Sequence, residues 1–228
     1  MRPRRAKPAA MKLFLDTANL DELRTETALT VIDGVTTNPS LLAKEGMPPE
    51  DQIRRICEIV KGDVSAPVMA TEAKEMVREG RRFAAIASNV VVKVPLTPEG
   101  IAAVAVLAKE NIRTNVTLCF SAAQALLAAK TGASMVSPFI GRVDDLGWPG
   151  VKLVEDIVTI YRNYGYKTEL LAASIRGPLH LTEAAKAGAH IATLSPKVFH
   201  QLFLHPLTNV GLEQFLRDHK ESFEAVGA

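Results

Sequence analysis

The chain has 228 residues, of which 47% are hydrophobic and 23% charged, and its formal net charge is +2. This composition fits one domain with a large core, and it argues against nucleic acid or a charged membrane as partner because no basic cluster is interleaved with aromatics. No apolar run is long enough for a transmembrane helix, and Cys57 and Cys119 form neither a disulfide framework nor a metal-binding spacing. We expect a cytoplasmic protein with reduced thiols, no metal site and a small-molecule partner.

The start of the chain is basic and has no apolar segment behind it that would make a signal peptide. We expect residues 1–10 to form a disordered tail and residues 11–228 to form the folded domain. From Met11 onward, short β-rich runs alternate about eight times with longer amphipathic runs. The predicted strands are Lys12–Asp16, Gly34–Thr37, Val64–Ala70, Val90–Pro95, Arg113–Thr117, Met135–Pro138, Thr168–Ala173 and Ala189–Leu194. The predicted helices include Pro49–Lys61, Glu72–Ala85, Glu99–Lys109, Ala122–Lys130, Val151–Tyr164 and Leu179–Lys186.

This alternation predicts an α/β fold in which a parallel sheet closes into a single-domain (β/α)8 TIM barrel. An open, doubly wound sheet is the alternative, but no GxGxxG motif follows the first strand. Two helix ends support the repeating unit, because Gly132 and Gly188 each suit a left-handed helix cap just before a strand. We also expect a C-terminal helix near Leu212–Phe223.

Lys93 interrupts the run Val90–Pro95, which otherwise is typical of a strand buried on both faces. Burial lowers the pKa of an amine and leaves part of it neutral, so that it can condense with a ketone or aldehyde to form a Schiff base. Alternatively, the lysine lies at the strand mouth with its charged end in solvent. The strand alone does not decide between a covalent centre and a solvated lysine.

Polar residues end or follow most of the predicted strands, where the active sites of TIM barrels lie. Spacings of two residues place both members of a pair on one strand face, toward the barrel mouth. Helix capping is the alternative for several of these residues, namely Asp16 with Thr17, Asn38 before Pro39, Thr71 and Ser121. The joint pattern favours a shared pocket formed by Asp16, Thr37, Asn38, Lys93, Asn115, Thr117, Ser137, Phe139, Ser174 and Arg176.

Arg142 and Arg176 follow predicted strands on the side of the barrel away from the second strand. Guanidinium groups, together with a hydroxyl and a helix N-terminus, suit a phosphate group. For either arginine alone, a solvated surface position or an ion pair with Asp144 or Asp145 is favoured over phosphate binding.

Five ordered motifs carry a family resemblance: Phe14–Ala18, Asp33–Leu41, Val91–Thr97, Asn115–Ser121 and Ser137–Arg142. They resemble the short bacterial transaldolases and the related fructose-6-phosphate aldolases, over roughly Met11 to Phe223. The resemblance implies a class I aldolase mechanism in a barrel, with no metal and no cofactor. It further implies a homo-oligomer, with a decamer as the candidate assembly, in which the C-terminal helix packs on a neighbour. Alternatively, the apolar face of that helix closes its own barrel.

The resemblance also implies roles for individual residues. Lys93 is similar to the Schiff-base lysine that attacks the C2 carbonyl of a ketose phosphate. Asp16 is similar to the acid/base that takes the proton of the C4 hydroxyl as the C3–C4 bond breaks, and Thr117 to the residue that positions the catalytic water. The resemblance implies that the dihydroxyacetone unit is bound by Thr36, Asn38, Asn115 and Ser137, and the phosphate by Arg142, Ser174 and Arg176. Phe139 is a further implied substrate-binding position.

One position departs from the family pattern. Pro67 stands where the resemblance predicts a glutamate or glutamine that holds the catalytic water, and proline can neither accept a proton nor hold a water. Glu72 could substitute for it, Thr117 could hold the water with Asp16 alone, or activity is impaired. A glutamate at a helix start is more simply a favourable charge on the helix dipole.

The implied activity is the transfer of dihydroxyacetone between sugar phosphates, as in the pentose phosphate pathway. The donors are sedoheptulose 7-phosphate or fructose 6-phosphate, and the acceptors are glyceraldehyde 3-phosphate or erythrose 4-phosphate. A fructose-6-phosphate aldolase that releases free dihydroxyacetone is the alternative enzyme. Phe139 favours transfer, because the matching residue is a tyrosine in those aldolases. A sugar-phosphate-binding protein that lost its catalysis through Pro67 is the alternative of another class.

Overall fold

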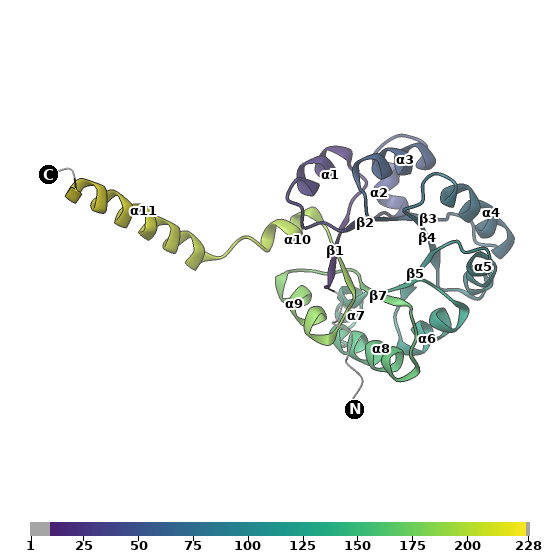
Figure 1. The fold of residues 1–228 in the computed structure, drawn as a ribbon. Coiled ribbons are helices and arrows are strands. Elements are labelled where there is room, and N and C mark those ends of the chain that lie inside the picture. Colours follow the sequence, from purple (N-terminus) through teal and green to yellow (C-terminus); the bar gives the residue numbers. More distant parts are fainter. Residues whose placement is uncertain (1–9, 227–228) are drawn as a thin grey trace, which may run out of the picture.

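A computed structural model describes residues 10–226 of the chain. Within these residues, eight parallel strands pair in chain order, and the last pairs with the first to close a barrel (Figure 1). Helices surround the barrel, so the predicted (β/α)8 fold is confirmed and the open sheet is excluded. The predicted disordered tail, residues 1–10, lies outside the described residues except for its last position.

The strands are β1 (Lys12–Asp16), β2 (Gly34–Thr36), β3 (Asp63–Pro67), β4 (Val90–Pro95), β5 (Thr114–Cys119), β6 (Met135–Pro138), β7 (Glu169–Ala172) and β8 (Ile191–Leu194). The helices are α1 (Leu20–Thr27), α2 (Pro39–Lys44), α3 (Pro49–Ile59), α4 (Ala73–Ala84), α5 (Pro98–Lys109), α6 (Ala122–Thr131), α7 (Ile140–Asp144), α8 (Gly150–Tyr164), α9 (Pro178–Ala187), α10 (Pro196–Gln201) and α11 (Pro206–Val226). Gly132 and Gly188 adopt the predicted left-handed cap, with φ of +91° and +90°.

The prediction for the third strand was too long at its end. The backbone N–H groups of Met69 and Ala70 donate to the Glu79 carboxylate, at 2.7 and 3.2 Å, instead of continuing the ladder. The strand β3 therefore ends at Pro67 and not at Ala70. The fifth strand is longer than predicted, because it continues past Thr117 through an irregularity at Leu118, whose φ is +59°.

The barrel interior has an apolar level below a polar one. Phe14, Val91, Met135, Leu171 and Ile191 form a buried cluster inside the barrel. Gly34 makes room for it, because a Cβ at this position would lie 2.6 Å from the Phe14 ring. Two residues further along their strands come Asp16, Thr36, Lys93, Ser137 and Thr193, so this polar level rests on a packed floor.

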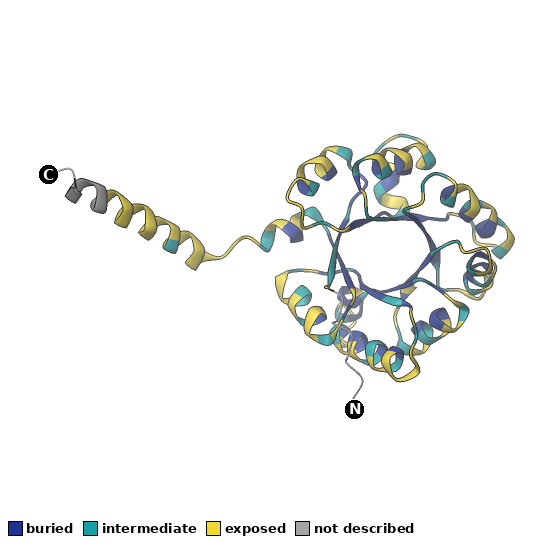
Figure 2. Ribbon diagram, viewed as in Figure 1, coloured by how far each residue is buried: buried dark blue, intermediate teal, exposed yellow. Residues whose placement is uncertain are grey.

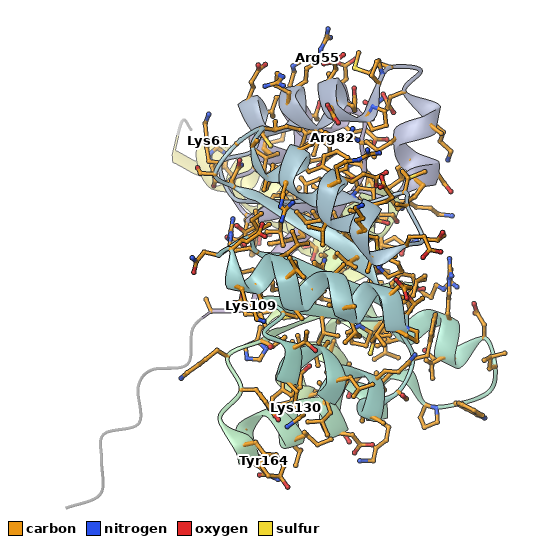
Figure 3. All side chains as sticks on the ribbon, turned by 90° about the vertical axis from the view of Figure 1, so that its right-hand side faces the viewer. Arg55, Lys61, Arg82, Lys109, Lys130 and Tyr164 are labelled. Carbon is orange, nitrogen blue, oxygen red and sulfur yellow. The ribbon has the colours of Figure 1, made fainter. Side chains whose placement is uncertain are left out.

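The helices bury one face against the outside of the barrel and expose the other (Figure 2). The inward residues of strands and helices form one continuous core. Charged side chains such as Arg55, Arg82 and Lys109 lie on the outward faces (Figure 3). None of the helices in the described part of the chain is long and apolar enough to cross a membrane.

The C-terminal helix α11 extends away from the barrel (Figure 1). Its side chains are exposed over almost the whole described part, including Leu207, Leu212, Phe215 and Leu216. The expectation that its apolar face closes its own barrel is therefore wrong.

Candidate active site

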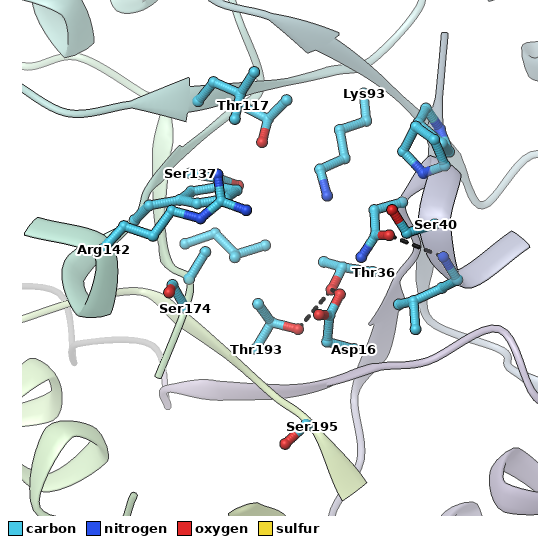
Figure 4. A pocket seen from close by; sticks show the side chains of 18 of the residues that line it. Asp16, Thr36, Ser40, Lys93, Thr117, Ser137, Arg142, Ser174, Thr193 and Ser195 are labelled. Carbon is cyan, nitrogen blue, oxygen red and sulfur yellow. Dashed lines mark hydrogen bonds between the residues drawn. The ribbon is translucent and has the colours of Figure 1, made fainter. Parts of the chain in front are cut away.

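A cavity of about 610 Å³ opens at the C-terminal ends of the strands. It lies above the apolar floor and is lined by strand ends and by the loops and short helices that follow them (Figure 4). All of the site residues predicted from the sequence line this cavity except Thr37 and Asn115, which are fully buried. The topology thus brings together residues from six of the strands and their following loops.

Lys93 projects from β4 into this cavity (Figure 4). Only 8% of the residue is exposed, and Nζ donates to the backbone oxygen of Thr37 at 2.9 Å, so its charged end does not lie in bulk solvent. Burial lowers the pKa of the amine, and the Asp16 carboxylate partly offsets this by favouring the charged form. An amine in this setting is suited to nucleophilic attack on a carbonyl group.

Asp16 ends β1 and is held by a hydroxyl pair. Thr36 Oγ1 donates to Asp16 Oδ1 at 2.7 Å and lies 2.6 Å from Thr193 Oγ1 (Figure 4). The capping role that the sequence left open for Asp16 falls to Asn19, whose side chain accepts from the first N–H groups of α1. The Asp16 carboxylate therefore remains in the cavity, where it can exchange a proton with a bound molecule.

A second polar chain lies next to Lys93. Ser137 Oγ donates to Asn115 Oδ1 at 2.7 Å, and Asn115 Nδ2 donates to Ser65 Oγ at 3.0 Å. Asn115 thus orients Ser137 from below the cavity. Thr117 Oγ1 is buried and has no hydrogen-bond partner among the described residues. It is therefore a donor and acceptor available to a bound molecule.

Asn38 both caps a helix and lines the cavity, the two roles that the sequence suggested for it. Its Oδ1 caps α2 by accepting from Leu41 N at 3.0 Å, while the residue lines the cavity. The cap uses the oxygen and not the amide nitrogen, so capping and ligand binding are compatible.

Two arginines lie at the side of the cavity that α7 and the loop after β7 form. Arg142 lies over the Phe139 ring, with its guanidinium carbon 5.1 Å from the ring centroid. Arg176 Nη2 pairs with Asp145 Oδ2 at 2.6 Å, so the ion pair that the sequence offered as an alternative is present. Gly141 permits the close approach of these segments, because a Cβ there would lie 2.1 Å from Ser174 O.

Sequence reasoning missed four polar residues of the site, of which Ser40 lines the cavity from α2. Thr193 and Ser195 line the cavity from β8 and its following loop, and Ser65 of β3 bonds Asn115. The spacing of Thr193 and Ser195 is the same two-residue spacing that identified pairs on other strands. Applied to the last strand, that signal would have found them.

Pro67 lines the cavity and pairs in register with Lys93. Thr37 N donates to Ser65 O, so in this parallel ladder an N–H at position 67 would face Thr37 O. Proline has no N–H, and Lys93 Nζ donates to that oxygen instead. Glu72 is exposed, caps no N–H of α4 with its side chain, and does not line the cavity.

In residues 10–226, no group of three or more His, Cys, Asp or Glu side chains is arranged to hold a metal ion.

Comparison with known proteins adds a family and relatives. Residues 13–227 match the model of the transaldolase/fructose-6-phosphate aldolase family. A probable transaldolase of Sorangium cellulosum is 56% identical over 216 residues, which cover 95% of this chain and all of the relative. A probable transaldolase of Clostridium kluyveri is 56% identical over 208 residues, 91% of this chain and 97% of the relative. One from Kosmotoga olearia is 55% identical over 217 residues, 95% of this chain and all of the relative.

Proposed function

This chain belongs to the transaldolase/fructose-6-phosphate aldolase family, and we propose that it is a transaldolase that transfers a dihydroxyacetone unit between sugar phosphates. The observation that carries the proposal is the buried amine of Lys93, whose pKa is lowered, in a cavity that also holds the Asp16 carboxylate and two arginines. The probable transaldolases to which the chain is similar support an aldolase-type enzyme.

The proposed reaction begins when the neutral amine of Lys93 adds to the C2 carbonyl of fructose 6-phosphate or sedoheptulose 7-phosphate. Loss of water gives a protonated imine, which serves as an electron sink. Asp16 takes the proton of the C4 hydroxyl as the C3–C4 bond breaks. The electron pair of that bond moves into the imine to give an enamine. The aldose phosphate leaves, and the enamine then attacks the aldehyde of glyceraldehyde 3-phosphate or erythrose 4-phosphate. Asp16 returns its proton to the new hydroxyl, and water releases the product from Lys93.

The remaining residues have binding roles in this proposal. Thr36, Asn38, Asn115 and Ser137 orient the hydroxyl groups of the three-carbon unit, and Thr117 positions the water that enters and leaves the imine. The buried, unpartnered Oγ1 of Thr117 supports the last assignment. Arg142, Ser174 and Arg176 form a phosphate clamp, because guanidinium groups bind phosphate through paired, charge-assisted hydrogen bonds.

A fructose-6-phosphate aldolase remains the second candidate, and a specific residue favours transfer over it. Phe139 lies between the Phe120 ring and Arg142 and offers no hydroxyl to the bound unit. A site without that proton donor is less suited to releasing free dihydroxyacetone by protonating the enamine. A binding protein without catalysis is the third candidate, and it rests on Pro67.

One assay separates the three candidates. The full chain is incubated with fructose 6-phosphate, with or without erythrose 4-phosphate, and products are followed by mass spectrometry. A transaldolase forms sedoheptulose 7-phosphate and glyceraldehyde 3-phosphate only when the acceptor is present. An aldolase releases dihydroxyacetone at an equal rate without acceptor. Binding of fructose 6-phosphate with no product in either reaction would contradict both enzymatic functions.

We further propose that the protein is a homo-oligomer, with a decamer as the candidate assembly, and that it acts in the cytoplasm in the pentose phosphate pathway. The exposed apolar side chains of α11, such as Leu212 and Phe215, support contact with a neighbouring subunit. The free thiols of Cys57 and Cys119 fit a reducing compartment.

A further inference from the structure

His180 connects the two segments that carry the arginines of the cavity. It lies in the first turn of α9, and its side chain is partly buried. The backbone N–H of Arg176 donates to His180 Nδ1 at 3.2 Å, and His180 Nε2 lies 3.1 Å from Asp144 Oδ2. The imidazole thus touches the loop after β7 through one nitrogen and the end of α7 through the other.

These contacts indicate which ring nitrogen of His180 carries the proton. An imidazole nitrogen that accepts a hydrogen bond carries no proton, so in neutral His180 the proton is on Nε2, toward Asp144. Asp144 is itself fixed, because its Oδ1 accepts from Gly150 N at 2.8 Å. Its Oδ2 is buried, and among the described residues it is His180 Nε2 that lies near this oxygen. The contact to Oδ2 lies at ion-pair distance but lacks full hydrogen-bond alignment.

The ring therefore links the two segments on which the phosphate clamp depends. Arg176 is the residue whose N–H it accepts, and Asp144 belongs to α7, two residues after Arg142. The Arg176 side chain is exposed and pairs with Asp145, so its charged end is held only by a surface ion pair and by its approach to Gly141. The N–H to Nδ1 bond restrains the backbone from which this side chain extends.

We propose that His180 is a positioning residue for the phosphate clamp: by accepting the Arg176 N–H while it contacts Asp144, it holds Arg176 at a fixed position relative to Arg142. This inference rests on the proposed function, because it assumes that the two arginines bind the substrate phosphate. His180 does not line the cavity, so it acts through Arg176 and not on the substrate.

The test compares His180→Leu, which fills similar space without an acceptor, with His180→Asn, whose Oδ1 keeps an acceptor near the Nδ1 position. Arg176→Ala serves as the reference for losing the clamp. For each full-length variant we would measure KM and kcat with fructose 6-phosphate, the concentration of unphosphorylated dihydroxyacetone that gives half-maximal trapping on Lys93 with cyanoborohydride, and inhibition by inorganic phosphate. If His180→Leu does not fold, His180→Ala, which also lacks an acceptor, takes its place.

In His180→Leu we expect KM for fructose 6-phosphate and the inhibition constant of phosphate to rise about three- to tenfold, as expected for losing one hydrogen bond. The kcat value and the dihydroxyacetone concentration for half-maximal trapping should stay within about twofold, and His180→Asn should restore most of the phosphate affinity. Equal losses for fructose 6-phosphate and dihydroxyacetone, or His180→Asn as weak as His180→Leu, would overturn the positioning role. If Arg176→Ala leaves phosphate inhibition unchanged, the clamp itself is wrong and the inference about His180 falls with it. If phosphate inhibition weakens in Arg176→Ala but not in His180→Leu, only the positioning role of His180 is rejected.

Discussion

Lys93 and Asp16 project into one cavity from β4 and β1, and the carboxylate favours the charged form of the amine. Burial lowers the pKa of the Lys93 amine, while the carboxylate of Asp16 raises it. No direct ion pair joins them within the described residues, since Lys93 donates to Thr37 O and Asp16 accepts from Thr36. This separation leaves room for a carbonyl carbon at the amine and a hydroxyl at the carboxylate, which is the arrangement that the proposed cleavage needs.

Reductive trapping should label a single lysine. With fructose 6-phosphate and sodium borohydride, we expect a three-carbon adduct on Lys93, because it combines burial, a lowered pKa and access to the cavity. Peptide mass spectrometry would locate the adduct. Lys93→Met, which keeps an unbranched side chain without an amine, should abolish labelling, whereas an adduct elsewhere in that variant would reject Lys93 as the covalent centre.

The pH dependence of trapping should reveal the opposing effects on Lys93. Because burial lowers the pKa, the neutral amine appears below the ordinary value of 10.5, and the trapping rate should rise with pH and level off below that value. In Asp16→Asn the carboxylate that raises the pKa is gone, so the midpoint should move to lower pH. The experiment uses dihydroxyacetone with cyanoborohydride, and exposed Lys109 serves as the internal reference. A midpoint that moves upward in Asp16→Asn would contradict the assignment.

Asp145 competes with phosphate for Arg176. The exposed ion pair between them is worth roughly 0.2–1 kcal/mol, so Asp145→Asn should tighten inhibition by inorganic phosphate by up to about fivefold. Glu183→Gln is the matched control, because it removes a similar exposed pair, with Lys186, outside the cavity. Weaker inhibition in Asp145→Asn would instead mean that Asp145 orients Arg176 for binding.

Much of this architecture could be predicted because its signals are local. Apolar strands that alternate with amphipathic helices indicate the barrel, and the barrel places each strand end at the cavity. The end of β3 could not be predicted, because Glu79, ten residues further along the chain, captures the N–H of Met69 in place of the ladder. The role of the His180 ring was also missed, since its contacts with Arg176 and Asp144 appear only once the loop after β7 and the end of α7 meet the start of α9.

The C-terminal helix should carry subunit contacts. Phe215 is 72% exposed on α11, and burying it against a neighbour would remove a large apolar side chain from water. Phe215→Ser should therefore shift the sedimentation profile toward smaller species while the circular dichroism spectrum keeps its shape. Leu127→Ser changes an exposed apolar residue on α6 and should sediment like the unchanged protein. Indistinguishable profiles for all three proteins would argue that α11 does not hold the assembly together.

Pro67 gives the most informative substitution at the site. The family resemblance predicts a water-holding glutamate or glutamine at this position, next to Lys93 in the register of β3 and β4. Water-mediated acid/base help typically contributes about 10²–10⁴-fold, and imine formation and release need it more than the carbon–carbon cleavage that Asp16 drives. The unchanged protein should thus be slow but active, and Pro67→Glu should raise turnover with little change in KM.

Pro67→Glu also restores a backbone N–H that faces Thr37 O, the acceptor of the Lys93 amine. Pro67→Ala restores the same N–H without a carboxylate, so it isolates the backbone effect. We expect Pro67→Ala to leave turnover unchanged or lower it, because the new N–H competes with Lys93 for the carbonyl. In single-turnover measurements, the imine should then hydrolyse faster in Pro67→Glu than in Pro67→Ala. Equal rates in the two variants, with a loss of activity in Glu72→Gln, would show that Glu72 supplies the missing acid/base help from outside the cavity.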